Sequence, residues 1–153
     1  MRKTVSLFAT AALAAGIALF GAGGPAAAAA ASQIVFYNTQ YDAPGTDTRT
    51  NAHLNLEWIS IINNGTAGVQ LRGWTIRDKA NHVFTFGTTT IPAKTRLLVH
   101  TGRGTPVPNH RYYNSGNYIW NNTGDTAYLR NAAGTPMDSC SWGSVSGRSV
   151  APC

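Results

Sequence analysis

Acidic residues and cysteines are both scarce in this chain. Its 153 residues include six carboxylates, against twelve lysines and arginines, and two cysteines, Cys140 and Cys153. Because no cysteine precedes position 140, a cysteine-based zinc cluster is excluded. The chain also lacks a His-Glu-x-x-His zinc signature, and residues 143–147 carry valine where a Gly-x-Ser-x-Gly turn needs serine. The sequence therefore predicts a protein that is not an enzyme.

Helical periodicity is missing beyond the N-terminal segment. Short runs rich in β-branched and aromatic residues alternate with Gly, Pro, Asn and Asp turns, which predicts an all-β antiparallel sandwich. The expected strands cover residues 33–38, 54–58, 69–71, 74–76, 82–86, 96–100 and 137–142. A hairpin is expected over Tyr118–Arg130, turning at residues 121–125. The expected strands carry four tryptophans, predicted to share an aromatic core: Trp58, Trp74, Trp120 and Trp142.

The N-terminus has the pattern of a cleavable signal peptide. Met1-Arg2-Lys3 is basic, residues 5–20 are apolar and uncharged, and small residues follow up to Ala31. A membrane anchor is the alternative, but the apolar run is shorter than a spanning helix needs. We expect residues 1–31 to be removed and residues 32–153 to form one secreted, extracellular, monomeric domain without a membrane span.

The charge of the expected mature chain is moderately positive. Removing Arg2 and Lys3 leaves ten basic residues against six acidic ones, a net charge of +4. The basic residues are scattered and form no run. This pattern favours modest attraction to anionic polymers and gives only weak support to nucleic acid as a partner.

An even cysteine count in an exported chain predicts a disulfide between Cys140 and Cys153. Such a bond would hold the Gly- and Ser-rich C-terminal tail in place. Two free thiols or an intermolecular bridge are the alternatives.

A calcium site is the one cofactor that the sequence suggests. Oxygen-bearing side chains crowd the long loop over residues 39–53 and the segment after it, and Ca²⁺ prefers six to eight oxygen ligands. The candidate ligands are Asp42, Asp47, Asn55 and Glu57. The alternative is that the aspartates cap turns through neighbouring backbone groups.

A second candidate site lies at the start of the other long loop, residues 101–117. A glycine-rich turn with an arginine can present N–H groups and a guanidinium to phosphate or sulfate. The candidate anion-binding residues are His100, Gly102, Arg103 and Gly104. The alternative is a flexible turn, since no helix follows as in phosphate-binding loops.

Five stretches in order resemble the lamin tail domain family, an immunoglobulin-like β-sandwich. They are residues 54–59, 71–78, 82–86, 99–104 and 120–130, within a match from about Ile34 to Asp138. The resemblance implies a sandwich without catalytic residues, in the exported bacterial form of the module. A nuclear-envelope role does not transfer, because the chain has no heptad coiled coil and no cysteine four residues from its end.

We therefore expect a secreted, non-catalytic binding or adhesion module that contacts an extracellular protein or an anionic polymer through its long loops. The alternative from another class is a small secreted hydrolase, possibly metal-dependent, using Asp42, Asp47 and Glu57. A third candidate is a structural part of an exported coat.

Overall fold

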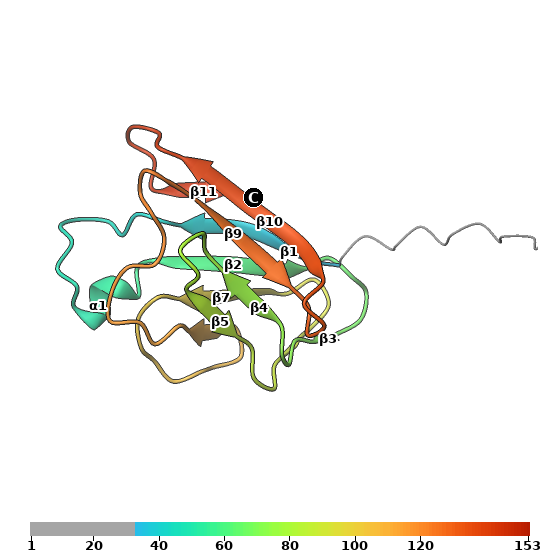
Figure 1. The fold of residues 1–153 in the computed structure, drawn as a ribbon. Helices are drawn as coiled ribbons and strands as arrows, with labels where there is room; N and C mark the ends of the chain where they lie inside the picture. The colour runs from blue at the N-terminus through green and yellow to red at the C-terminus, as the bar shows by residue number, and fades with distance from the viewer. Residues whose placement is uncertain (1–32) are drawn as a thin grey trace, which may run out of the picture. The chain divides into compact units, whose positions relative to one another are not determined.

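The described part of the chain folds into two β-sheets that face each other (Figure 1). The computed structural model describes residues 33–153, so the predicted signal peptide, residues 1–31, lies outside the described residues. Strands dominate and the described residues contain one short helix, which confirms the predicted all-β class. Within residues 33–153, no helix is both long and apolar enough to cross a membrane.

The first sheet has five strands in the order β11-β1-β2-β7-β8. Its strands are β1 (Ile34–Gln40), β2 (Trp58–Asn63), β7 (Arg96–His100), β8 (His110–Tyr112) and β11 (Val150–Pro152). All neighbours are antiparallel except β7 and β8, which run parallel. The expectation of a wholly antiparallel sandwich is therefore wrong at this edge, because residues 101–109 carry the chain back along β7, so that His110 pairs with Leu98.

The second sheet has four strands in the order β10-β9-β4-β5. Its strands are β4 (Thr75–Arg77), β5 (Val83–Thr85), β9 (Gly124–Arg130) and β10 (Pro136–Gly143). A separate pair joins β3 (Val69–Gln70) to β6 (Thr90–Ile91). The Asp138 carboxylate accepts a hydrogen bond from the Phe36 N–H at 2.7 Å, which ties β10 to β1 at one edge of the sandwich.

The core lies between the sheets and follows the period-2 alternation of the strands. Ile59 and Ile61 of β2 and Ala127 and Leu129 of β9 are fully buried. Trp120 and Trp142 meet edge to face with ring centroids 5.6 Å apart. Trp74 packs against this core, whereas Trp58 is half-buried and outside it, so three of the four tryptophans occupy the predicted place.

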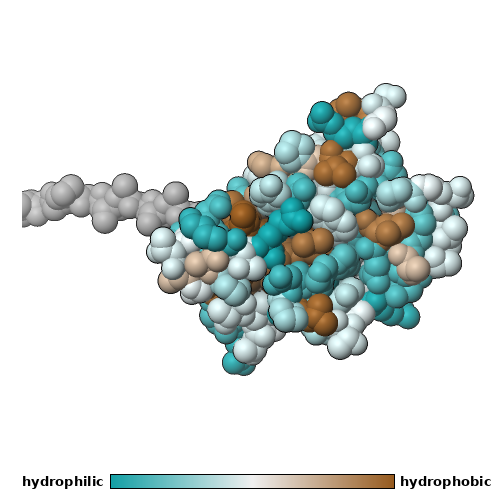
Figure 2. All heavy atoms as spheres, turned by 180° about the vertical axis from the view of Figure 1, so that it is seen from behind, coloured by the Kyte–Doolittle hydropathy of each residue, from teal (hydrophilic) through white to brown (hydrophobic). Residues whose placement is uncertain are grey.

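The face of the domain that is turned away from the viewer in Figure 1 is mixed in polarity. Figure 2 shows its apolar side chains in separate groups among polar ones. This face therefore shows no single continuous apolar patch.

Two predicted strands have a different structure. Residues 54–57 of the strand predicted over 54–58 do not form a strand, because Asn51–Leu54 form the helix α1, in which the Thr50 hydroxyl caps the His53 N–H, and β2 begins only at Trp58. Leu56 is exposed and Glu57 is 1% exposed, the reverse of the expected alternation. A polar residue can occupy such a buried position because its oxygen accepts backbone hydrogen bonds.

The predicted Tyr118–Arg130 hairpin is also wrong. Residues 118–120 lie outside the strands, and β9 begins at Gly124, where φ is +132°. The hairpin at this place joins β9 to β10 through residues 131–135. Asp125 is the physical reason, since its carboxylate accepts from the backbone N–H groups of Asn121 and Thr126 and folds residues 121–125 into a compact turn.

The structure contains the predicted disulfide between Cys140 and Cys153. Cys140 lies on β10 and Cys153 directly follows β11, so the bond links an edge strand of each sheet. The described residues contain no free cysteine.

Candidate functional site

The two long loops meet at one end of the sandwich, and the segment around α1 holds them together. His53 contacts the Tyr118 hydroxyl through Nδ1 at 2.6 Å and the Pro44 carbonyl through Nε2 at 3.1 Å. One imidazole thus joins the loop before α1 to the segment that follows the second loop. The capped start of α1 sets the position of this ring.

Two asparagines fix the backbone of Arg103. Asn51 donates to the Arg103 carbonyl at 3.0 Å and accepts from its N–H at 2.7 Å. Asn55 also donates to this carbonyl, at 3.0 Å. The adjoining Gly102 allows this close approach, because a Cβ atom there would lie 2.5 Å from Asn55 Oδ1. The turn is therefore held in one conformation by side chains of the other loop.

Glu57 is the buried anchor of the second loop. Its Oε1 accepts hydrogen bonds from the Thr101 hydroxyl at 2.5 Å, the Ile119 N–H at 2.8 Å and the Trp120 N–H at 3.4 Å. Burial raises the pKa of Glu57 from 4.5 to about 7, although these hydrogen bonds act in the opposite direction. One carboxyl group, whose pKa is close to neutral pH, therefore holds both the first residue of the loop over residues 101–117 and the segment just after that loop.

The two loops enclose a recess of about 280 Å³ with two arginines on its walls. Arg49 and Arg103 are both exposed and lie on opposite loops, and Asn51 and Ser115 complete the polar lining. Neither arginine takes part in an ion pair with another residue of the described range 33–153. Two guanidinium groups with free donors are suited to a carboxylate, sulfate or phosphate group.

A histidine pair lies beside this end of the sandwich. His100 contacts the Asn55 carbonyl through Nδ1 and His110 through Nε2, both at 2.8 Å. Because a carbonyl can only accept, His100 donates a hydrogen bond through Nδ1. Nε2 of its neutral ring then accepts a hydrogen bond from the Nδ1–H group of His110. Burial lowers the pKa of His100 below 6.5, and His110 acts in the same direction. The sequence did not predict this pair, because only the parallel β7–β8 pairing brings the two strands together.

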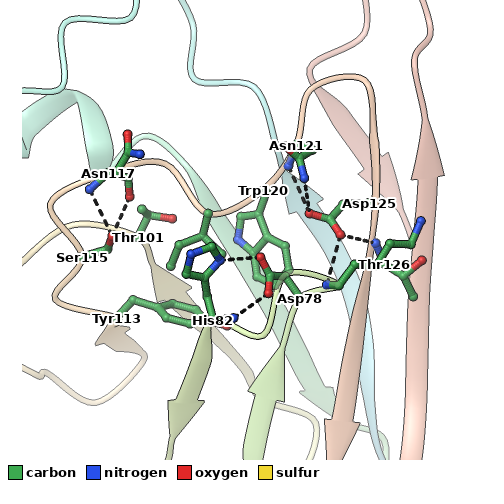
Figure 3. A network of polar contacts seen from close by, with 12 residues as sticks. Asp78, His82, Thr101, Tyr113, Ser115, Asn117, Trp120, Asn121, Asp125 and Thr126 are labelled. Atoms are coloured by element: carbon green, nitrogen blue, oxygen red, sulfur yellow. Dashed lines mark hydrogen bonds and ion pairs between the residues drawn. The ribbon is translucent and has the colours of Figure 1, made fainter.

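Two further carboxylates are buried as backbone acceptors at this end (Figure 3). Asp78 accepts from His82 through the backbone N–H at 2.7 Å and through Nδ1 at 2.6 Å. Asp125 accepts from residues 121 and 126, as described above. Burial, with the nearby charges of Asp78, Glu57 and Asp125, raises the pKa of Tyr113 well above its ordinary value of 10. These carboxylates hold loops in place.

Three of the four predicted calcium ligands have separate partners. Asp42 accepts from the Asn122 side chain at 2.9 Å, Asn55 holds the Arg103 carbonyl, and Glu57 binds its own three donors. Asp47 is exposed on the first loop. No group of three or more His, Cys, Asp or Glu side chains within residues 33–153 is arranged to hold a metal. Calcium binding stays a prediction from the sequence.

The predicted anion-binding residues are only partly brought together. Arg103 lines the recess, but the His100 ring is engaged by Asn55 and His110, and the Arg103 N–H is occupied by Asn51. Gly104 lies against the Tyr112 ring, which a Cβ atom would approach to 2.4 Å. The second cation of the recess, Arg49, was missed, because its position opposite Arg103 depends on how the two loops meet.

Two facing sheets with connecting loops gathered at one end define an immunoglobulin-like β-sandwich. The family profile of the Lamin Tail Domain matches residues 27–144, which is well over half of the sequence, so the chain belongs to the lamin tail domain family. No curated protein matches the chain.

Proposed function

We propose that this lamin tail domain is an exported, non-catalytic binding module that recognises an anionic group of an extracellular partner between its two long loops. The observation that carries the proposal is the recess in which Arg49 and Arg103, from different loops, face a shared space. The surrounding contacts of His53, Asn51 and Glu57 hold the loops before any ligand arrives. A preorganised site loses less conformational entropy on binding than a mobile loop does.

The rival function, a small hydrolase, has less support from the same residues. Glu57 is 1% exposed and its Oε1 accepts three hydrogen bonds, so it is poorly placed to meet a substrate. Asp42 lies in a different recess, with residues 144–149. A general acid–base pair needs two carboxyl groups that reach the same bond. The buried Glu57 does not offer its carboxyl group to a substrate, and Asp42 lies in a recess that neither Asp47 nor Glu57 lines.

Retention of the secreted chain on cell-surface material, at low and moderate salt, tests this function. The chain is collected from the medium of an exporting host, and its N-terminal residue, expected between about 27 and 32, is read by mass spectrometry. We expect Arg49→Gln combined with Arg103→Gln to abolish retention on cell-wall fractions. The control is Arg72→Gln, an exposed arginine that does not line this recess.

Equal retention of the double variant and the wild type would contradict the proposed site. Loss of all retention at moderate salt, for wild type and variants alike, would indicate non-specific attraction and would contradict it as well.

A further inference from the structure

The outer face of the four-stranded sheet carries a second group of cations, distant in sequence from the loop recess. Alternation buries Ile76 and Leu129 in the core and turns Arg77, Tyr128 and Arg130 outward, where each is half-buried. This sheet, with β9 and β4 side by side, is the one nearer the viewer in Figure 1. Its outer face is not covered by another element of the sandwich.

The register places an aromatic ring between the cations. Tyr128 is paired with Arg77 on one side and with Ser139 on the other, and Arg130 is paired with Thr75. Arg77 and Arg130 are thus diagonal neighbours on one face, a separation of about 7–8 Å between their backbones. Hydroxyl groups and guanidinium groups therefore surround one tyrosine.

Two adjoining recesses follow this arrangement. One, of about 470 Å³, is lined by Tyr128, Arg130, Pro136 and Met137 among others. The other, of about 440 Å³, is lined by Arg77, Lys79, Tyr128 and Arg130 among others. Because Tyr128 and Arg130 belong to both, the recesses form one trough that is apolar at one end and cationic at the other.

The cations in the trough are not neutralised by the described part of the protein. Arg77 donates to the Asn81 amide oxygen at 3.3 Å and Arg130 to the Gly134 carbonyl at 2.9 Å, both neutral acceptors. The side chain of Asp78 is fully buried and paired with His82. Asp138, at the apolar end, already accepts from the Phe36 N–H. Charge complementarity therefore calls for an anionic occupant.

We propose that this trough binds an acidic polysaccharide, with a sugar ring against Tyr128 and carboxylate groups on Arg77, Lys79 and Arg130. A ring-shaped, hydroxyl-rich unit fits the apolar end, and a guanidinium binds a carboxylate in bidentate fashion. Single-stranded nucleic acid is a poorer fit, because such ligands stack on successive aromatic rings, whereas the outward positions of β4, β9 and β10 offer one. The proposal rests on the function above only in treating the domain as a binding module.

Binding of the full secreted chain to polygalacturonate, a polymer of uronic acid, tests the proposal. Poly-L-glutamate supplies carboxylates without sugar rings, dextran supplies sugar rings without charge, and single-stranded DNA supplies phosphates and bases. We expect polygalacturonate to bind more tightly than all three. Arg130→Gln and Tyr128→Thr should each weaken its binding about tenfold, as the loss of one charge-assisted or aromatic contact predicts. Lys79→Gln, at an exposed turn where loss of the fold is not expected, should weaken it several-fold.

The outcomes separate the two surfaces. Arg72→Gln, an exposed arginine that lines none of these recesses, should leave polygalacturonate binding unchanged. If Arg49→Gln combined with Arg103→Gln abolishes the binding and the sheet variants do not, the trough proposal is wrong and the loop recess takes the ligand. Equal affinity for poly-L-glutamate with no effect of Tyr128→Thr would reduce the interaction to charge attraction and overturn the proposal. Tighter binding of single-stranded DNA would also overturn it.

Discussion

Replacing Glu57 with glutamine should make the protein more stable at alkaline pH and remove most of a pH dependence of folding. Glutamine keeps an oxygen that accepts from Thr101, Ile119 and Trp120, but it cannot ionise. The perturbation therefore separates the charge of the buried carboxyl group from its role as an acceptor.

The magnitude follows from the shift in the pKa. Folding raises the pKa of Glu57 from 4.5 to about 7, and one pKa unit corresponds to about 1.4 kcal/mol. A raised carboxyl pKa means that the fold favours the protonated form. The stabilisation of the fold by the protonated Glu57 is therefore complete below pH 4.5, and it is lost as the pH rises through 7. The full difference is about 3 kcal/mol, of which about 2.5 kcal/mol falls between pH 5 and pH 8.

Urea unfolding at pH 5, 6, 7 and 8, followed by tryptophan fluorescence, measures this difference. The buried Trp120 and Trp142 provide the signal. We expect the wild type to lose about 2.5 kcal/mol relative to Glu57→Gln across this range, with unchanged m-values. Glu57→Leu serves as a control, since it leaves three donors without an acceptor and should cost roughly 3 kcal/mol or more at every pH.

A wild type that gains stability relative to Glu57→Gln as the pH rises would refute the reasoning. It would mean that the three hydrogen bonds to Oε1 outweigh the cost of burying the charge. Parallel curves for the two proteins would mean that Glu57 keeps its ordinary pKa in the fold.

Two other predictions concern stability. Replacing Cys140 and Cys153 with alanine should lower the free energy of unfolding by about 3 kcal/mol, which is the loop-closure contribution of a bond with a sequence separation of 13. Calorimetry should show a Tm that is lower by roughly 10 °C. An unchanged Tm would contradict a stabilising role of the disulfide. The lowered pKa of His100 means that the fold favours its neutral form, so this stabilisation is present above pH 6.5 and is lost as the pH falls below it. Relative to His100→Asn, the wild type should lose stability between pH 7 and pH 5 in urea unfolding, and a gain in that window would show that the Asn55 hydrogen bond outweighs burial.

Local patterns in the sequence were sufficient for the strands with clear alternation. The segments 96–100 and 137–142 were predicted close to their observed bounds, because period-2 burial is a property of neighbouring residues. The disulfide followed from the even cysteine count together with the export pattern at the N-terminus. By contrast, β6, β8 and β11 are too short to carry a pattern and exist because a partner strand lies beside them.

Only the tertiary structure decided the parts of the molecule that bear on function. Arg49 and Arg103 lie far apart in the sequence, and Glu57 is buried because the donors of Thr101, Ile119 and Trp120 converge on it. Similarly, Tyr128 stands between cations because β4 and β9 pair in one register out of several that alternation would allow. A sequence determines which face of a strand is apolar, whereas the pairing of strands and loops depends on contacts between residues distant along the chain.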